Sequence, residues 1–343
     1  MLLTIVSAVF VFGLLVLVHE WGHFITAKMT NMRVDEFAIG FGPKLLGWKR
    51  GETLYAIRAI PLGGYNRIAG MDMDEDENDA GDRAYFKRPV WARMIVILAG
   101  SIMNFILPVV LFFLIFFFVG IQSPSVEPVV GGVMDSSPAA SAGLVAGDRI
   151  TSVNGHEVTE WKNISEILKD SAGTPIALTY LREGEQKETT VIPVEEPSSK
   201  RVIIGIQGTL VAHEVSLGDA AIMSVEKTWT IFKSMLEALV MLVTKEGASA
   251  ELSGPIGVAQ MAGEVAQHGF IPLLNFAAFL SLNLGIVNLL PVPALDGGHF
   301  VTLVIEAVRG KQMSRQAMYY IQAVGVVLLI SLMLFATFND ITR

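Results

Sequence analysis

The chain has 343 residues, of which 52% are hydrophobic and only 17% are charged, and it contains no cysteine. This composition is typical of a membrane protein, and the lack of cysteine excludes disulfides, iron–sulfur clusters and thiol chemistry. The formal net charge of −8 comes largely from one acidic run in residues 72–82, which we interpret as a solvated loop. No basic patch with interleaved aromatic residues occurs, so no nucleic-acid partner is expected.

The first predicted element is an apolar helix that ends in a metal-binding pattern. Residues 1–18 are almost wholly apolar, and the sequence H-E-W-G-H follows, with His19, Glu20 and His23. On a helix the two imidazoles lie one turn apart on one face, where both can bind one zinc ion, and the glutamate can act as a base on water at the metal. Ionisable residues at membrane depth are costly unless they are paired, bound to metal or facing a cavity. We therefore predict a zinc site in a first transmembrane helix over residues 1–27.

This N-terminal segment is expected to be retained as a span rather than removed as a signal peptide. It has no basic n-region and no small-residue cleavage site, and it carries the metal-binding pattern. Without cysteine, only His, Asp and Glu remain as plausible zinc ligands in this chain.

Residues 28–93 form a polar segment rich in glycine, which we expect to be cytoplasmic. Within it, residues 54–60 have the aliphatic and aromatic composition of a strand and are bounded by turn-forming residues. An apolar strand beside a membrane needs paired backbone groups, either in its own hairpin or with an added peptide strand. A small soluble subdomain fits the same residues equally well.

A second transmembrane helix is predicted over residues 94–120, which are nearly free of charge. Near its start, Gly100 and Asn104 fall on one face of the helix. A neighbouring helix could pack closely against this face, with the amide turned inward.

The next segment, residues 123–210, has the composition of a soluble domain with short alternating strands and one helix. Residues 137–150, followed by Val153, Asn154 and Gly155, resemble bacterial PDZ domains, in which a short helix leads to a strand and Asn-Gly makes a hairpin turn. A PDZ groove binds a peptide by strand addition, so a peptide C-terminus is an expected ligand. The residues at the position of the family's peptide-binding loop are Gly131, Gly132 and Val133.

Residues 217–268 are predicted to form a helical region at the membrane interface. Residues 217–244 follow a helical pattern but carry Glu226, Lys227, Lys233 and Glu237, and their uninterrupted apolar part is too short to span a bilayer. An amphipathic helix in the interface is preferred over a membrane crossing.

A third transmembrane helix is predicted over residues 271–300, and a fourth over residues 316–338. The third ends in the sequence N-x-x-P-x-P-x-L-D-G-G, whose prolines and glycines open the helix around Asp296. A carboxylate in a broken helix at membrane depth is a candidate functional residue.

The distribution of basic residues predicts the orientation of the chain in the membrane. The segment 28–93 carries eleven Lys and Arg residues, and the connection between the third and fourth spans carries Arg309, Lys311 and Arg315. The positive-inside rule places both connections in the cytoplasm, and the PDZ domain and both termini outside. The H-E-W-G-H sequence and Asp296 then lie at the same depth, towards the cytoplasmic face.

These motifs together resemble the site-two proteases, which are intramembrane zinc metalloproteases, and within them the bacterial RseP type (regulator of sigma-E protease). The resemblance covers essentially the whole length: H-E-W-G-H, G-F-G-P, P-L-G-G-Y, the PDZ insertion, S-G-P-I-G and N-x-x-P-x-P-x-L-D-G-G. It implies a polytopic α-helical membrane protein with four transmembrane helices, an inserted α/β PDZ domain and a membrane-associated β-loop, located in the bacterial inner membrane. One departure is that only one PDZ domain fits here, where well-studied members of this type carry two.

The resemblance also implies roles for individual residues. Zinc (Zn²⁺) would be held by His19, His23 and Asp296, and Glu20 would be the general base. Asn288 would help to hold an extended substrate strand. The β-loop residues expected to present substrate are Tyr55, Ala56, Ile57, Pro61, Gly63, Gly64 and Tyr65.

The expected activity is that of a zinc metalloendopeptidase in regulated intramembrane proteolysis. Its substrates would be single-span membrane proteins in the lipid bilayer, such as an anti-sigma factor or a remnant signal peptide. His299 is not expected to be a ligand, because the fourth position on zinc should stay open. The other histidines expected at the surface are His156, His213 and His268.

Two functions of other classes are alternatives to the protease. A membrane metal transporter would also need intramembrane His and Asp, but it predicts internal repeats, and none is seen. An inactive PDZ scaffold predicts a damaged motif, whereas Glu20, both histidines and Asp296 are all present.

Overall fold

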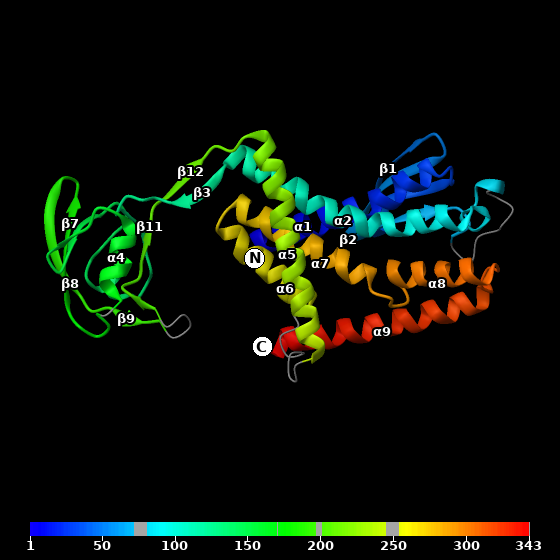
Figure 1. The fold of residues 1–343 in the computed structure, drawn as a ribbon. Coiled ribbons are helices and arrows are strands. Elements are labelled where there is room, and N and C mark those ends of the chain that lie inside the picture. Colours follow the sequence, from blue (N-terminus) through cyan, green and yellow to red (C-terminus); the bar gives the residue numbers. More distant parts are fainter. Residues whose placement is uncertain (72–80, 170, 197–200, 245–253, 343) are drawn as a thin grey trace. The chain divides into compact units, whose positions relative to one another are not determined.

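The computed structural model forms two compact units (Figure 1), Met1–Ile115 with Leu217–Arg343, and Phe116–Ser216. The residues described are 1–71, 81–169, 171–196, 201–244 and 254–342. Most of the acidic run, which was predicted to be a solvated loop, lies outside these residues.

Four helices of the described residues are long and apolar enough to cross a membrane. They are α1 (Leu2–Met29), α2 (Val90–Val119), α7 (Phe270–Leu289) and α9 (Arg315–Thr342). The prediction of four transmembrane helices is confirmed in this sense, because each provides the roughly 20 apolar residues that a bilayer core requires.

The predicted third span is shorter than expected, because its last residues belong to a separate helix. The span α7 ends at Leu289, and α8 (Asp296–Arg309) begins after a proline-containing stretch that cannot continue a helix. A Cβ on Gly297 would lie 2.3 Å from the carbonyl oxygen of Leu289, so α8 can fold back against the end of α7 only with glycine there. This return places Asp296 in the first turn of a new helix.

After the second unit ends at Ser216, the chain forms α5 (Leu217–Thr244) and α6 (Pro255–Gln267), which precede α7. The helix α5 is not among the four that can cross a membrane, and its interfacial location remains a prediction. The helix α6 packs against α1 and α9, and the Asp340 carboxylate of α9 accepts hydrogen bonds from the backbone N–H groups of Gly254 and Gly257. These bonds satisfy donors at the start of α6 that have no partner within the helix.

Between α1 and α2, the chain forms a folded hairpin from β1 (Val34–Arg50) and β2 (Thr53–Ile68). Each long strand bends, so the first half of β1 lies between the two halves of β2; Ala38, for example, pairs with both Tyr65 and Ala56. The apolar strand predicted over residues 54–60 therefore has its backbone groups paired within the chain's own hairpin. Two short 3₁₀ helices, η1 (Gly81–Arg83) and η2 (Tyr85–Lys87), then lead to α2.

The second unit is a PDZ-like β domain with two helices. A four-stranded antiparallel sheet has the order β6-β5-β7-β8, and three two-stranded pairs are β4 with β11, β9 with β10 and β3 with β12. The strands are β3 (Ile121–Pro124), β4 (Val130–Val133), β5 (Arg149–Val153), β6 (His156–Glu157), β7 (Ile176–Arg182), β8 (Glu185–Val191), β9 (Val194–Glu195), β10 (Val202–Ile203), β11 (Ile206–Gly208) and β12 (Leu210–His213), and the helices are α3 (Pro138–Ser141) and α4 (Trp161–Leu168).

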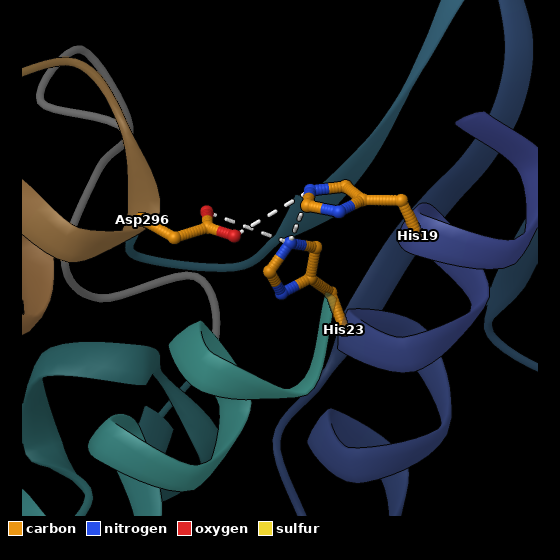
Figure 2. Close-up of side chains that lie close together, drawn as sticks. All are labelled: His19, His23 and Asp296. Atoms are coloured by element: carbon orange, nitrogen blue, oxygen red, sulfur yellow. Dashed lines mark hydrogen bonds and ion pairs between the residues drawn. The ribbon is translucent and has the colours of Figure 1, made fainter. Parts of the chain in front are cut away.

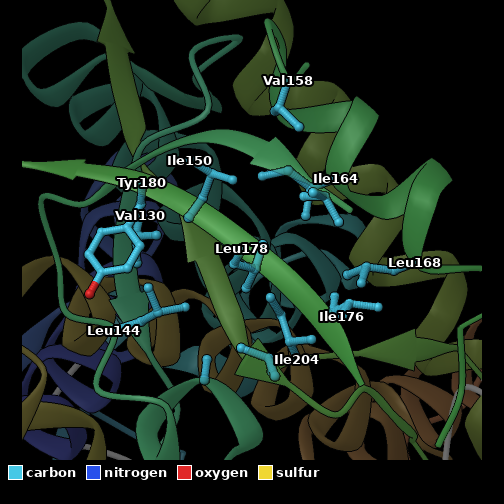
Figure 3. Close-up of a cluster of buried hydrophobic side chains, with 13 residues drawn as sticks. Val130, Leu144, Ile150, Val158, Ile164, Leu168, Ile176, Leu178, Tyr180 and Ile204 are labelled. Carbon is cyan, nitrogen blue, oxygen red and sulfur yellow. The ribbon is translucent and has the colours of Figure 1, made fainter. Parts of the chain in front are cut away.

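The core of this domain follows from the alternation of apolar residues along its strands (Figure 3). Ile176, Leu178 and Tyr180 alternate along β7 and are buried, while Ile164 and Leu168 of α4 pack against the same cluster. The predicted Asn-Gly turn is confirmed by the positive φ angles of Asn154 (50°) and Gly155 (78°), between β5 and β6.

A buried ion pair stabilises the domain and makes it sensitive to acid. The Asp148 side chain is fully buried, and it accepts hydrogen bonds from Arg182 (Nε, 2.7 Å; Nη2, 2.8 Å) and from the N–H of Val145 (2.9 Å). Burial by itself would raise the pKa of Asp148, but the donors of Arg182 and Val145 outweigh it and lower the pKa below its ordinary value of 3.8.

Replacing this carboxylate is expected to destabilise the PDZ-like domain at neutral pH. A carboxyl group whose pKa is lowered on folding contributes stability above its unfolded pKa and loses it as the pH falls through the folded pKa. An Asp148→Asn variant of the full-length protein should therefore lose about 2–3 kcal/mol between pH 5 and 7, and this deficit should shrink below about pH 4. Amide hydrogen exchange in β5 and β7 measures the loss. Asp135→Asn at an exposed position is the control, and equal effects of the two variants would contradict the prediction.

Candidate metal centre

The two histidines of α1 direct their imidazoles to one point, which a carboxylate from α8 also reaches (Figure 2). The Nε2 atoms of His19 and His23 lie 3.1 Å apart. Asp296 places Oδ2 at 3.5 Å from His19 Nε2 and Oδ1 at 3.7 Å from His23 Nε2. The three side chains offer ligand atoms that all lie within 4.8 Å of one another. Asp296 lies 273 or more positions after the two histidines in the sequence, and the fold brings the three side chains together in a group that can hold a metal ion.

The far side of each imidazole is bound to α2. His23 Nδ1 lies 2.7 Å from the carbonyl oxygen of Val96, which accepts only a hydrogen bond, so Nδ1 carries the proton and the Nε2 lone pair faces the centre. His19 Nδ1 lies 3.1 Å from the amide of Asn104, whose Oδ1 is buried without a hydrogen-bond partner among the described atoms. If the side-chain amide of Asn104 is rotated by 180°, its Oδ1 and Nδ2 exchange places, and Oδ1 then accepts a hydrogen bond from His19 Nδ1–H. The Nε2 lone pair of His19 then faces the centre as well.

Glycines allow α1 and α2 to approach and keep the centre open. A Cβ on Gly22 would lie 2.5 Å from the carbonyl oxygen of Ala99, so the two helices are in close contact there. A Cβ on Gly100 would lie 2.3 Å from His23 Nε2 and 2.7 Å from His19 Cε1. The predicted close packing at Gly100 is thus observed, and a single methyl group would fill the space between the imidazoles.

The donor set fits Zn²⁺. Two imidazole nitrogens and one carboxylate oxygen are ligands that zinc accepts, and three protein ligands leave a fourth position open, as in catalytic zinc sites. His19, His23 and Asp296 would hold such an ion.

The third member, Asp296, is held by its helix and by a serine of α2. Its place in the first turn of α8 puts the carboxylate at the positive end of the helix dipole. The buried hydroxyl of Ser101 donates a hydrogen bond to Oδ2 at 3.0 Å. Sequence reasoning did not single out Ser101; its one signal is a hydroxyl within an apolar span, which needs a partner.

Glu20 lies beside the centre and is bound by the hairpin. Asn66 of β2 donates from Nδ2 to the carboxylate Oε2 of Glu20 at 2.8 Å and to its backbone oxygen at 2.6 Å. A Cβ on Gly64 would lie 3.1 Å from Glu20 Cγ, so this strand passes directly over the glutamate. Sequence reasoning missed Asn66; the signal was its spacing of two residues from Gly64, which puts both on one face of a strand.

The first half of the segment expected to present substrate is paired on both sides within the chain's own hairpin. Tyr55 pairs with both Phe37 and Trp48, and its two successors are likewise paired on both sides. Neither edge of Tyr55, Ala56 or Ile57 is therefore free to receive an added strand, and their expected contact with substrate stays a prediction.

The later half of β2 differs, because its residues pair with one strand only among the described residues. Gly64 pairs with Ile39 and Tyr65 with Ala38, and the structure describes no strand on the other edge. Gly63 has a φ of 145°, and a Cβ there would lie 2.1 Å from Cε2 of the Phe41 ring. The backbone of Pro61 belongs to β2, and its side chain lies outside the described atoms.

The other predicted residues lie as follows. Asn288 is half-buried in the last turn of α7, and its side chain makes no hydrogen bond within the described part of the chain, so its role remains a prediction. His299 lies 2.5 Å (Nε2 to Nε2) from the amide of Gln322 and is not in the ligand group. The three histidines expected at the surface, His156, His213 and His268, are exposed.

The residues expected in the peptide-binding loop of the PDZ-like domain belong to a strand. Gly131, Gly132 and Val133 lie in strand β4, and the last two pair with Gln207 and Ile206 of β11. These residues form a strand covered by a neighbour rather than an open loop. The strand was not foreseen because the sequence does not reveal which later strand pairs with these residues, and their role in peptide binding stays a prediction.

Comparisons with known proteins agree with this site. A model of Peptidase family M50 matches residues 7–332. A relative from Clostridium acetobutylicum is 37% identical, and the match covers 98% of this chain and 97% of the relative. The regulator of sigma-W protease RasP of Bacillus subtilis is 32% identical, with 99% and 98% covered. The PDZ domain of an SdrC-like protein from Listeria monocytogenes matches 26% of this chain and 94% of that domain at 23% identity; its TM-score of 0.23 is too low to support an argument. The chain therefore belongs to peptidase family M50, the site-two proteases, and is a multi-pass membrane zinc metalloprotease with a PDZ-like domain.

Proposed function

We propose that this protease hydrolyses peptide bonds in or near the membrane-spanning segment of single-span membrane proteins. The observation that carries the proposal is the meeting of His19, His23 and Asp296 beside Glu20, on helices long and apolar enough to lie in a bilayer. The proposed substrates are an anti-sigma factor or a remnant signal peptide. The Bacillus subtilis relative is named a regulator of sigma-W protease, which supports the first of these.

In the proposed mechanism, His19, His23 and Asp296 hold Zn²⁺. When bound, this ion supplies Lewis acidity, which polarises a carbonyl and brings the pKa of water near neutrality. Glu20 takes a proton from the attacking water and passes it to the leaving amide nitrogen. The hydrogen bonds of Val96, Asn104 and Ser101 hold the ligands in place throughout, so their positions need not be reorganised during the reaction.

The substrate must be extended at the site of cleavage. A helix hides each carbonyl in an internal hydrogen bond, and unpaired backbone groups cost several kcal/mol each in hydrocarbon. We propose that the substrate adds as a strand to the edge of β2 at Gly63, Gly64 and Tyr65, which passes over Glu20. The amide of Asn288 would contribute a further hydrogen bond to this strand.

The proposed orientation follows from the basic residues. The hairpin segment 28–93 and the connection after α8 would lie in the cytoplasm of a bacterial cell, and the PDZ-like domain and both termini outside. The metal centre would then lie towards the cytoplasmic side of the inner membrane. A peptide C-terminus bound by the PDZ-like domain would act from the opposite side.

A Glu20→Gln variant tests the proposal. With a purified single-span substrate in liposomes, we expect cleavage to fall about 10³-fold or more, because the base that moves the proton is removed while the ligands remain. Zinc content should stay at the level of the parent. The exposed Glu264→Gln in α6 is the control and should cleave normally. Cleavage by Glu20→Gln at the parent's rate would refute the assigned base.

A further inference from the structure

The hairpin contributes one polar side chain to the centre that neither the family resemblance nor the sequence assigned. We propose that Asn66 is a positioning residue that fixes the carboxylate of Glu20 and couples it to the strand that receives the substrate. This inference rests on the proposed role of Glu20 as the base.

The geometry of Asn66 restricts Glu20 to one conformation. A single Nδ2 group donates to the side-chain Oε2 (2.8 Å) and to the backbone oxygen (2.6 Å) of the same glutamate. The amide thus holds the carboxylate against its own helix and removes its freedom to rotate. The other carboxylate oxygen, Oε1, has no hydrogen bond to any described residue and remains available to water.

Nothing else in the described structure accounts for an amide at this position. Asn66 Oδ1 is buried and accepts no hydrogen bond there. Reversing the amide would place Oδ1 against two oxygens of Glu20, so the observed orientation is the favourable one. A buried polar atom without a partner is unfavourable, and an apolar side chain of the same shape would avoid that cost. The amide is therefore explained by its bonds to Glu20 and not by packing.

The position of Asn66 in the sheet connects these bonds to substrate binding. Side chains two residues apart in a strand share a face, and both Gly64 and Asn66 face Glu20. The intervening residue, Tyr65, pairs with Ala38 on one side and belongs to the edge proposed to receive the substrate. A strand added at this edge would order the residues that hold the base, so that Glu20 is best placed when substrate is bound.

The test replaces the amide by a side chain of similar shape without a donor. For Asn66→Leu in the full-length protein, we expect kcat to fall between about 10-fold and 100-fold, because misplacing a catalytic group by about 1 Å has an effect of this size. KM should stay within about twofold, and zinc content and melting temperature should match those of the parent. Asn66→Asp, which has the same shape but no N–H donor, should show the same loss of kcat. Asn275→Leu replaces a half-buried asparagine of α7 that is remote from the centre, and it should leave kcat unchanged.

Each outcome decides the matter. A parental kcat in either correctly folded Asn66 variant overturns the inference. The inference is also overturned if both variants lose kcat together with a lower zinc content or a lower melting temperature. Asn66 would then be needed for the stability of the fold and not for the position of Glu20. Failure of the proposed function is distinguished by Glu20→Gln. If Glu20→Gln remains active, the base itself is wrongly assigned; if it is inactive while Asn66→Leu is normal, only the present inference fails.

Discussion

Gly100→Ala is expected to weaken zinc binding and proteolysis severely, although it adds only one methyl group to a membrane helix. The new Cβ would lie 2.3 Å from His23 Nε2 and 2.7 Å from His19 Cε1, where no atom can be accommodated. The helices cannot separate to relieve the contact without losing the close approach of Gly22 to Ala99. The imidazoles must therefore turn away from the centre. We expect zinc affinity to fall at least about 100-fold, measured by chelator competition, with a parallel loss of kcat/KM.

The matched control for this substitution is Gly13→Ala. Gly13 also lies in a predicted span, α1, but no described atom outside its own turns of the helix lies within 4 Å of the position that its Cβ would take. Zinc binding and proteolysis should be unchanged in this variant, since alanine is the better helix former. Full zinc affinity in Gly100→Ala would mean that the imidazoles do not meet as the structure places them.

Asp296→Ala is expected to lower the affinity for zinc more than a substitution of any residue outside the three ligands. Removing the carboxylate leaves only the two imidazoles, and the affinity should fall by more than about 100-fold. Ser101→Ala removes only the hydrogen bond to Oδ2, and substitutions of such outer partners reduce metal affinity about 10-fold to 100-fold. Chelator competition on both variants gives the order directly, and added Zn²⁺ should restore the activity of Ser101→Ala at lower concentrations than that of Asp296→Ala.

The reverse order would contradict the assignment of Asp296 as a ligand. The same would follow if Asp296→Ala held zinc as tightly as the parent. Fully metal-free parent protein that still cleaves its substrate would exclude the zinc centre altogether, and restoration of cleavage by added Zn²⁺ is the expected result.

Features that depend on neighbours in the sequence could be predicted well. The spacing of His19 and His23 fixes their common face through the helical repeat, and this required no knowledge of the rest of the fold. The four spans follow from continuous apolar length. The break before Asp296 follows from prolines that cannot continue a helix. The helical repeat also puts Gly100 and Asn104 on one face, and in the structure that face packs against α1.

Features that depend on strand pairing could not be predicted. Residues 54–60 have the composition of a strand, but nothing in them indicates that Tyr55 is enclosed on both sides while Gly64 lies on an outer edge. In the PDZ-like domain, Gly132 looks like part of a loop until β11, more than 70 residues later, pairs with it. A strand carries the same composition at the centre and at the edge of a sheet, because pairing uses backbone groups that every residue has.

Residue type, spacing and apolar length were enough to place two candidate zinc ligands, His19 and His23, and the proposed base Glu20 on one membrane helix, and the family resemblance added Asp296. The tertiary structure decided what holds those groups, namely Ser101 on Asp296 and Asn66 on Glu20, and which edge of the hairpin is open. The physical reason is that a lone serine or asparagine has no periodicity to mark it. Its role depends on which distant side chain the folded chain brings within about 3 Å of its donor.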